Sequence, residues 1–163
     1  IIFPTMKKYL WYAKKTFTVN LITPYFKNDY KEIVKSPIVY FNDLGLRNSL
    51  LGVFGNLQEK DYSFAFQNFI TNILLERNRW SNARIKFWRT TTGREVDFII
   101  DEGAKITPIE VKYSALKSPK IEKSLSVFLN KYDPEEAIVV NLTLNEQKTF
   151  GKTKVNFIPF WKL

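Results

Sequence analysis

A long amphipathic segment followed by three short strand-like segments constrains the fold of this chain more than any other feature. From Ser63 to Arg79, apolar residues recur at three- and four-residue spacing, which predicts a helix. Apolar and polar residues then alternate in three runs, and turn residues separate these runs. The three predicted strands are 85–90, 95–100 and 106–112.

The segments that follow indicate the fold class. We expect a helix from about 119 to 131, then strands at 137–142 and 155–160. The order helix, three strands, helix, strand, strand predicts an α/β or α+β arrangement in which helices flank a central mixed sheet. A chain of 163 residues buries roughly 70% of its unfolded surface in such a core.

The first part of the chain has a pattern of its own. The segments expected there are a basic helix at 6–15, strands at 17–22 and 38–41, and a helix that Asp43 caps and that runs through Leu51. A helix and strands in a segment of this size predict a small winged-helix-like element over 1–55. Residues 52–60 have the composition of a linker, so a second domain is expected over 61–163.

Composition narrows the possible chemistry. The chain has no Cys and no His, which excludes disulfides, thiolate or imidazole metal sites, and nucleophiles that need a histidine base. No apolar stretch approaches the ~20 residues that cross a bilayer, and the first residues lack the charged region and cleavage site of a signal peptide, so we expect a cytoplasmic protein. Because the chain begins at Ile1 and its one Met is Met6, we expect a fragment of a longer protein.

A formal net charge of +9 predicts an anionic partner. Residues 1–60 carry 9 basic against 4 acidic residues, and 117–163 carry 8 against 5. Clustered lysine and arginine gain free energy by releasing counterions from nucleic acid, so DNA is the expected partner. The alternative is an ordinary solvated surface. The candidate DNA contacts are Lys7, Lys8, Lys14, Lys15, Arg89 and Arg94.

Acidic side chains alternate with apolar ones in two neighbouring predicted strands. Glu95 and Asp97 share one face of their strand, opposite Val96 and Phe98. In the next strand Glu110 and Lys112 share a face in the same way. Two carboxylates from adjacent strands would suit Mg²⁺ or Mn²⁺, and a lysine beside them would orient or deprotonate water or neutralise charge on a phosphate. Any half-solvated strand has the same alternation.

These segments resemble a known signature. Gly93-Arg94-Glu95-Val96-Asp97-Phe98 followed by Pro108-Ile109-Glu110-Val111-Lys112 resembles the D…ExK motif of the PD-(D/E)XK nuclease superfamily. Nearly the whole chain resembles the C-terminal domain of uncharacterised function that follows the ATPase module in archaeal and bacterial AAA-type ATPases. Further matching segments are 21–25, 35–41, 43–47, 87–90 and 158–161.

The resemblance implies a restriction-endonuclease-like core with Asp97, Glu110 and Lys112 as catalytic residues. Asp97 and Glu110 would hold the metal ion, and an N-terminal ATPase module would be the partner domain. The resemblance also implies a metal-binding glutamate in the preceding helix, where this chain has Gln67. An amide offers a neutral oxygen but no negative charge, so metal affinity should fall. Glu95 would either compensate or pair with a neighbouring arginine.

Three functions follow in order of preference. The first is a nuclease-fold accessory domain of an AAA-type ATPase that binds DNA and has a weakened metal site. The second is an active Mg²⁺- or Mn²⁺-dependent endonuclease, and the third is a protein-interaction module of the ATPase. Gly151-Lys152-Thr153 resembles the end of a P-loop, but Glu146 occupies the earlier glycine position, so we expect no ATP site in this chain. Phe87 and Trp88 would stack on bases or belong to the core.

Overall fold

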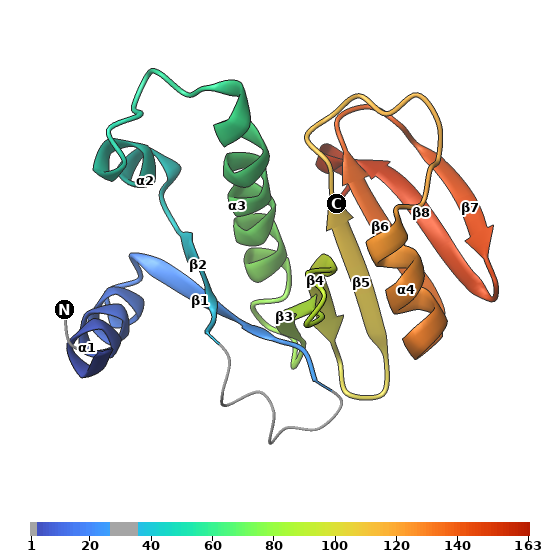
Figure 1. The fold of residues 1–163 in the computed structure, drawn as a ribbon, viewed down its shortest axis with the longest axis horizontal. Helices are drawn as coiled ribbons and strands as arrows, with labels where there is room; N and C mark the ends of the chain where they lie inside the picture. Colours follow the sequence, from blue (N-terminus) through green and yellow to red (C-terminus); the bar gives the residue numbers. More distant parts are fainter. Residues whose placement is uncertain (1–2, 27–35) are drawn as a thin grey trace.

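The computed structural model describes residues 3–26 and 36–163 (Figure 1). Its elements are α1 (Phe3–Lys15), β1 (Val19–Pro24), β2 (Ile38–Phe41), α2 (Leu44–Leu50), α3 (Glu59–Arg77), β3 (Arg84–Arg89), β4 (Glu95–Asp101), β5 (Ile106–Val111), α4 (Lys123–Tyr132), β6 (Glu136–Asn141), β7 (Glu146–Phe150), β8 (Thr153–Pro159) and the 3₁₀ helix η2 (Phe160–Lys162). The predicted class, helices packed on a mixed sheet, is confirmed.

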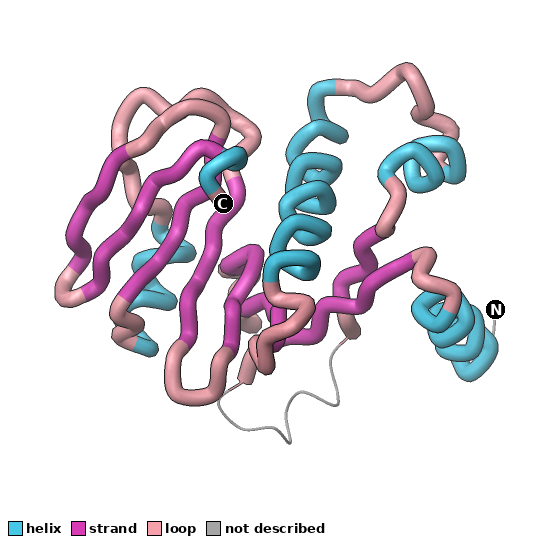
Figure 2. The backbone as a smooth tube through the Cα atoms, turned by 180° about the vertical axis from the view of Figure 1, so that it is seen from behind, coloured by secondary structure: helices cyan, strands magenta, loops and turns pink. Residues whose placement is uncertain are grey.

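The described strands form one sheet in the order β2-β1-β3-β4-β5-β6-β8-β7. The centre is an antiparallel run, β3 to β4 to β5, followed by parallel β6 and β8. Strand β1 joins β3 in parallel through only two residue pairs, Thr23–Lys86 and Pro24–Phe87. β1 and β2 share four antiparallel pairs. The tube in Figure 2 follows this sheet from the β1–β2 pair to β7.

The two faces of the sheet have separate apolar cores. On one face, Phe66, Ile70 and Leu74 of α3 pack on a cluster that includes Phe87. On the other, Leu125, Phe128 and Leu129 of α4 pack on a cluster that includes Trp88. Because consecutive strand residues point to opposite faces, one aromatic residue serves each core. Phe87 and Trp88 are both buried, so the interpretation of these two rings as base-stacking groups is wrong.

The winged-helix-like element predicted over 1–55 is not confirmed. Its two strands, β1 and β2, extend the same sheet that continues through β3, and Ile22 and Tyr40 are buried in the α3-side core. Asn68 of α3 is hydrogen-bonded to the edge strand β2. Its side chain accepts from the backbone N–H of Phe41 at 2.9 Å and donates to the carbonyl oxygen of that residue at 2.7 Å.

The start of α2 was predicted correctly from its capping residue, whereas the start of α3 was not. The predicted cap is confirmed, because Asp43 Oδ1 accepts from the Leu46 N–H at 2.8 Å. The end of the predicted linker is instead the start of α3, where the Asp61 carboxylate accepts from the Gln58 N–H at 3.2 Å. Strand β7 was not predicted. It is the edge strand at the other end of the sheet from β2, and its residues before Phe150 are polar and exposed, so it has no apolar alternation.

A β-bulge interrupts β4 next to the candidate site. Lys86 pairs with Ile99 and Trp88 with Val96, so two steps along β3 correspond to three along β4. The extra residue breaks the alternation of side chains. Phe98 consequently lies in the α3-side core, whereas Val96 and Ile99 both lie in the α4-side core. The prediction that Val96 and Phe98 share a face is wrong for this reason.

Candidate functional site

The candidate site lies where β4 and β5 separate. The pairing between these strands runs from Asp101–Ile106 to Phe98–Ile109 and goes no further. Beyond it, the Asp97 side chain takes the place of a backbone acceptor, since Oδ2 accepts from the Val111 N–H at 2.7 Å. We call this place, formed by Gln67, Asp97, Glu110 and Lys112, the fork.

Helix α3 supplies the second partner of Asp97. Gln67 Nε2 donates to Asp97 Oδ1 at 2.8 Å, so both carboxylate oxygens accept from N–H groups. Gln67 lies seven residues, almost two helical turns, before the buried Leu74, so the two side chains are on the same inward face of α3. The side-chain amide of Gln67 is therefore a hydrogen-bond donor to Asp97.

Glu110 is the most buried ionisable group of the fork, with 7% of its surface exposed. Lys112 Nζ lies 2.9 Å from Glu110 Oε1, which confirms that these two side chains share a face. Glu110 Oε2 is buried and has no hydrogen-bond partner within the described residues. A half-solvated strand does not account for a buried carboxylate of this kind, because burial of charge costs free energy unless partners compensate.

Asp97 and Glu110 approach each other from different sides of the sheet. Ile109 and Val111 pack in the α3-side core, so Glu110 between them leaves β5 toward the α4 side. Asp97 meets Gln67 on the α3 side. The sequence analysis expected both carboxylates on one face, and this was wrong. The charge of Glu110 nevertheless raises the pKa of Asp97, so the two carboxylates lie close enough to interact beyond the last β4–β5 pair.

Burial dominates the electrostatics of the fork. Burial, and after it the negative charge of Glu110, raises the pKa of Asp97 from 3.8 to about 7, although the Val111 N–H and Lys112 act in the opposite direction. Burial also raises the pKa of Glu110, against the influence of Lys112. Burial alone would lower the pKa of Lys112, but the carboxylates of Glu110 and Asp97 outweigh it and the pKa is raised. Perturbed groups of this kind are typical of functional sites.

The donor set fits a divalent cation poorly. Both Asp97 oxygens and Glu110 Oε1 face nitrogen-bound hydrogens, which leaves Glu110 Oε2 as the one carboxylate oxygen of the pair without such a partner. Mg²⁺ and Mn²⁺ need several oxygen donors. Over the part of the chain that the structure describes, no three Asp or Glu side chains gather in a metal-binding group. The ammonium group of Lys112 is the positive charge beside Glu110, where a bound metal ion would otherwise supply it.

The other predicted site residues lie apart from this pair of carboxylates or have other partners. Glu95 accepts from Arg89, with Oε2 2.6 Å from Nη2 and 2.8 Å from Nε, so its ordinary surface role is confirmed. Arg94 is half-buried in the turn before β4, where its backbone N–H donates to Thr90. The four lysines of α1 are exposed on a helix that packs beside β1, away from the fork.

A pocket of about 520 Å³ opens at the fork, and its lining includes Gln67, Asp97 and Lys112. Sequence reasoning missed four lining residues, Ser63, Phe64, Tyr113 and Ser114. Tyr113 directly follows the ExK segment and could have been found from its position. Ser63 and Phe64 come from the first turns of α3, whose contact with β5 was not visible in the spacing.

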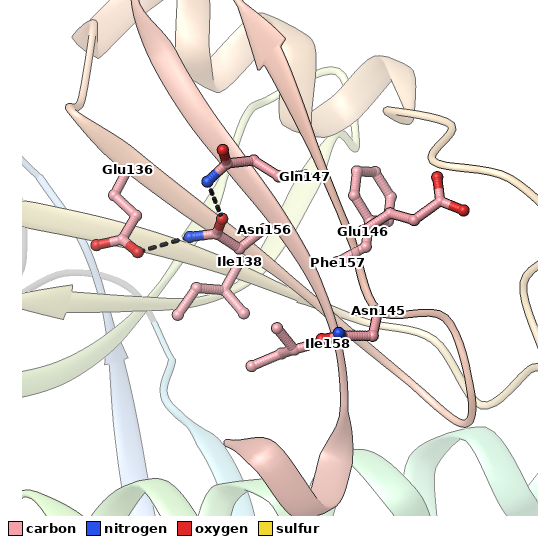
Figure 3. A pocket seen from close by; sticks show the side chains of 8 residues that line it. All are labelled: Glu136, Ile138, Asn145, Glu146, Gln147, Asn156, Phe157 and Ile158. Carbon is pink, nitrogen blue, oxygen red and sulfur yellow. Dashed lines mark hydrogen bonds between the residues drawn. The ribbon is translucent and has the colours of Figure 1, made fainter.

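A second pocket, of about 390 Å³, lies on strands β6, β7 and β8 and contains none of the predicted site residues (Figure 3). Three of its polar side chains are hydrogen-bonded to one another. Gln147 Nε2 donates to Asn156 Oδ1 at 2.7 Å, and Asn156 Nδ2 donates to Glu136 Oε1 at 2.7 Å. This ladder cross-links three strands, which is a structural role.

Two family models match the chain, one over its first third and one over the rest. Residues 62–163 match a family model described as "Domain of unknown function (DUF4143)". The chain belongs to the DUF4143 family. The match includes every residue of the fork, and domains of the DUF4143 family are commonly found in AAA-ATPase-associated proteins. Residues 1–57 match a second model, "Domain of unknown function (DUF8612)".

Two curated mycobacterial proteins are similar to this DUF4143 chain. They are "Uncharacterized protein Rv2008c" of Mycobacterium tuberculosis and "Uncharacterized protein Mb2031c" of Mycobacterium bovis. Each is 26% identical over an alignment of 127 residues that covers 74% of this chain. The aligned region is 27% of each relative, so the chain spans about a quarter of their length. In the described residues, no helix is long and apolar enough to span a bilayer.

Proposed function

We propose that this chain is a nuclease-fold accessory domain of a larger, cytoplasmic AAA-type ATPase, that it binds DNA, and that its fork holds a divalent cation weakly or not at all. One observation carries the proposal, a set of side chains that resembles the Asp…Glu-x-Lys site of nucleases. In this set, Lys112 Nζ lies 2.9 Å from Glu110 Oε1, and Asp97 accepts a hydrogen bond from Gln67. The order α3, β3, β4, β5, α4, β6 supports a PD-(D/E)XK-like core.

The charge of the chain supports DNA as the partner. The net charge is +9, and the lysines of α1 are exposed. Fluorescence anisotropy with a labelled DNA duplex at about 50 mM and about 200 mM salt tests this, because counterion release makes affinity fall steeply with salt. We expect Lys14→Glu with Lys15→Glu to weaken binding, and Lys152→Glu, in an exposed turn between β7 and β8, to weaken it less. Absence of binding at low salt would favour the protein-interaction module.

A nicking assay separates the weakened site from the active endonuclease. Supercoiled plasmid is incubated with Mn²⁺ and the wild type, Asp97→Ala or Lys112→Ala. We expect no cleavage above the level of the variants, because the carboxylate oxygens face hydrogen donors and Gln67 adds no charge. Robust cleavage that both substitutions abolish would replace this proposal with an active metal-dependent endonuclease.

A further inference from the structure

Six aromatic side chains touch one another beside the fork, and we call them the aromatic strip: Tyr62, Phe66, Phe69, Tyr113, Phe160 and Trp161. Three come from α3 at spacings of four and three residues, which places them on one face of the helix. The other three come from the segment after β5 and from η2. The first half of α3, the end of β5 and η2 lie at the same end of the molecule (Figure 1).

The strip is continuous. Ring centroids are 5.5 Å apart for Tyr62 and Tyr113, and 5.4 Å apart for Tyr113 and Phe66. The contacts continue from Phe66 to Phe160 at 5.7 Å and from Phe160 to Trp161 at 5.1 Å. These separations are those of packed aromatic pairs, so each ring helps to fix the next.

Much of the strip faces solvent. The exposed fractions are 37% for Tyr62, 39% for Phe69, 45% for Tyr113 and 63% for Trp161. Phe66 is buried beneath them and belongs to the α3-side core. Exposed apolar side chains scattered singly need no explanation, but a contiguous exposed group marks a binding surface.

Charge and position indicate what the strip would bind. Tyr113 lines the fork pocket together with Lys112, and the exposed Lys162 follows Trp161. The net charge of +9 attracts an anionic polymer to the molecule as a whole, and Lys162 is a cation next to the strip. Unpaired bases offer flat faces to aromatic rings, whereas a duplex keeps those faces stacked inside. An apolar protein segment would use the rings but not the charge.

We propose that the aromatic strip is a stacking platform for unpaired bases, so that single-stranded DNA is the preferred ligand of this domain. The inference rests on the proposed DNA-binding function and adds the form of DNA that the site takes. The strip adjoins the fork pocket through Tyr113, so a strand stacked on it would run along one edge of that pocket.

Fluorescence anisotropy with the 163-residue chain tests the inference. The probes are a labelled oligothymidylate of about 20 nucleotides and a labelled duplex of equal length. The variants are Tyr113→Ala and Trp161→Ala, and the matched control is Trp80→Ala. Trp80 is 91% exposed and outside the strip, and its ring lies against Arg79.

We expect the wild type to bind the single strand at least about five-fold more tightly than the duplex, and each strip variant to lose about five- to ten-fold for the single strand, given typical stacking energies. Trp80→Ala should retain wild-type affinity. Tyr113→Phe and Trp161→Phe keep a ring and should retain most of the binding, which ties any loss in the alanine variants to stacking. Circular dichroism melting checks that all variants are folded.

The outcomes separate this inference from the proposed function. If the duplex binds as tightly as the single strand, or if Trp80→Ala loses as much affinity as the strip variants, the strip is not the platform and DNA binding stands. Unchanged single-strand affinity in folded Tyr113→Ala and Trp161→Ala leads to the same conclusion. If neither form of DNA binds at low salt, the proposed function itself fails.

Discussion

At the scale of single residues, the fork is an acidic site whose charge is balanced internally. Lys112 compensates Glu110, and N–H donors from Gln67 and Val111 compensate Asp97. The ExK spacing predicted that Glu110 and Lys112 would share a face of their strand, but not that they would form an ion pair. Spacing did not predict that Asp97 would accept from a backbone N–H, since that contact depends on where β4 and β5 stop pairing.

Gln67→Glu is expected to convert the fork toward a metal site. Without metal, the change removes the donor to Asp97 and adds a like charge, so it should lower stability by about 1 to 3 kcal/mol. With Mn²⁺, a third carboxylate should raise the melting temperature more in the variant than in the wild type. Thermal melting with and without MnCl₂ measures both effects.

Gln147→Glu is the matched control for that change. Its amide also donates to a polar oxygen, Asn156 Oδ1 at 2.7 Å, but belongs to the β6–β7–β8 ladder. An equal response of Gln67→Glu and Gln147→Glu to Mn²⁺ would contradict the expectation that position 67 controls metal affinity.

The raised pKa of Asp97 predicts a pH dependence of stability. A carboxyl group whose pKa is about 7 in the folded chain and 3.8 otherwise binds its proton more tightly when folded. Its contribution to stability is therefore lost as the pH rises from about 4 to about 7, and Glu110, with its pKa also raised, acts with the same sign. The raised pKa of Lys112 acts only above 10.5, outside this window.

Asp97→Asn should flatten that dependence. Urea denaturation in EDTA between about pH 4 and about pH 7 would show a weaker decline in unfolding free energy for the variant than for the wild type. Glu102→Gln, at an exposed position in the turn before β5, should leave the decline as it is. Identical slopes for Asp97→Asn and the wild type would mean that Asp97 titrates normally.

At the scale of elements, helices and central strands followed from apolar periodicity, whereas two features did not. At the bulge in β4, two β4 residues lie opposite one β3 residue, and the residue types at 97 and 98 do not indicate a bulge. Strand β7 has the polar composition of a loop and is a strand because β8 offers it a partner. Both depend on pairing between strands, which a single segment does not encode.

Asn68→Ala should loosen the contact between α3 and the edge strand β2. The buried Asn68 side chain makes two hydrogen bonds to the Phe41 backbone, so its loss removes the acceptor of the Phe41 N–H and leaves the Phe41 carbonyl oxygen with the longer hydrogen bond from Asn72, at 3.2 Å. We expect a loss of about 1 to 3 kcal/mol of unfolding free energy in urea denaturation. Asn145→Ala, at an exposed position, serves as the control and should change stability by less than about 0.5 kcal/mol. A loss no larger than that of the control would rule out this role for Asn68.

At the scale of the whole molecule, the fold class was predictable but the arrangement of its two parts was not. The composition of 52–60 favoured a boundary there, and the strands on either side nevertheless share one sheet. The β1–β3 contact joins residues about sixty positions apart through two pairs, and nothing in local patterning indicates such a partner.

A chain reduced to residues 58–163 should therefore be less stable than the full chain. Its core would lose Ile22 and Tyr40, and β3 would become an unprotected edge. We expect a lower melting temperature and concentration-dependent association in size-exclusion chromatography. Removal of residues 1–15 alone, which takes away the largely exposed α1, should have a much smaller effect. An unchanged melting temperature for 58–163 would show that the core does not need the first two strands.

The short parallel contact between β1 and β3 also has a mechanical consequence. Two residue pairs join these strands, while four join β1 to β2. Tension applied through α1 would reach the rest of the sheet through the weaker of these connections. The first rupture in a single-molecule pulling experiment would accordingly detach β1 and β2 together, which also breaks the hydrogen bonds that Asn68 and Asn72 of α3 make with the backbone of Phe41 and Asn42.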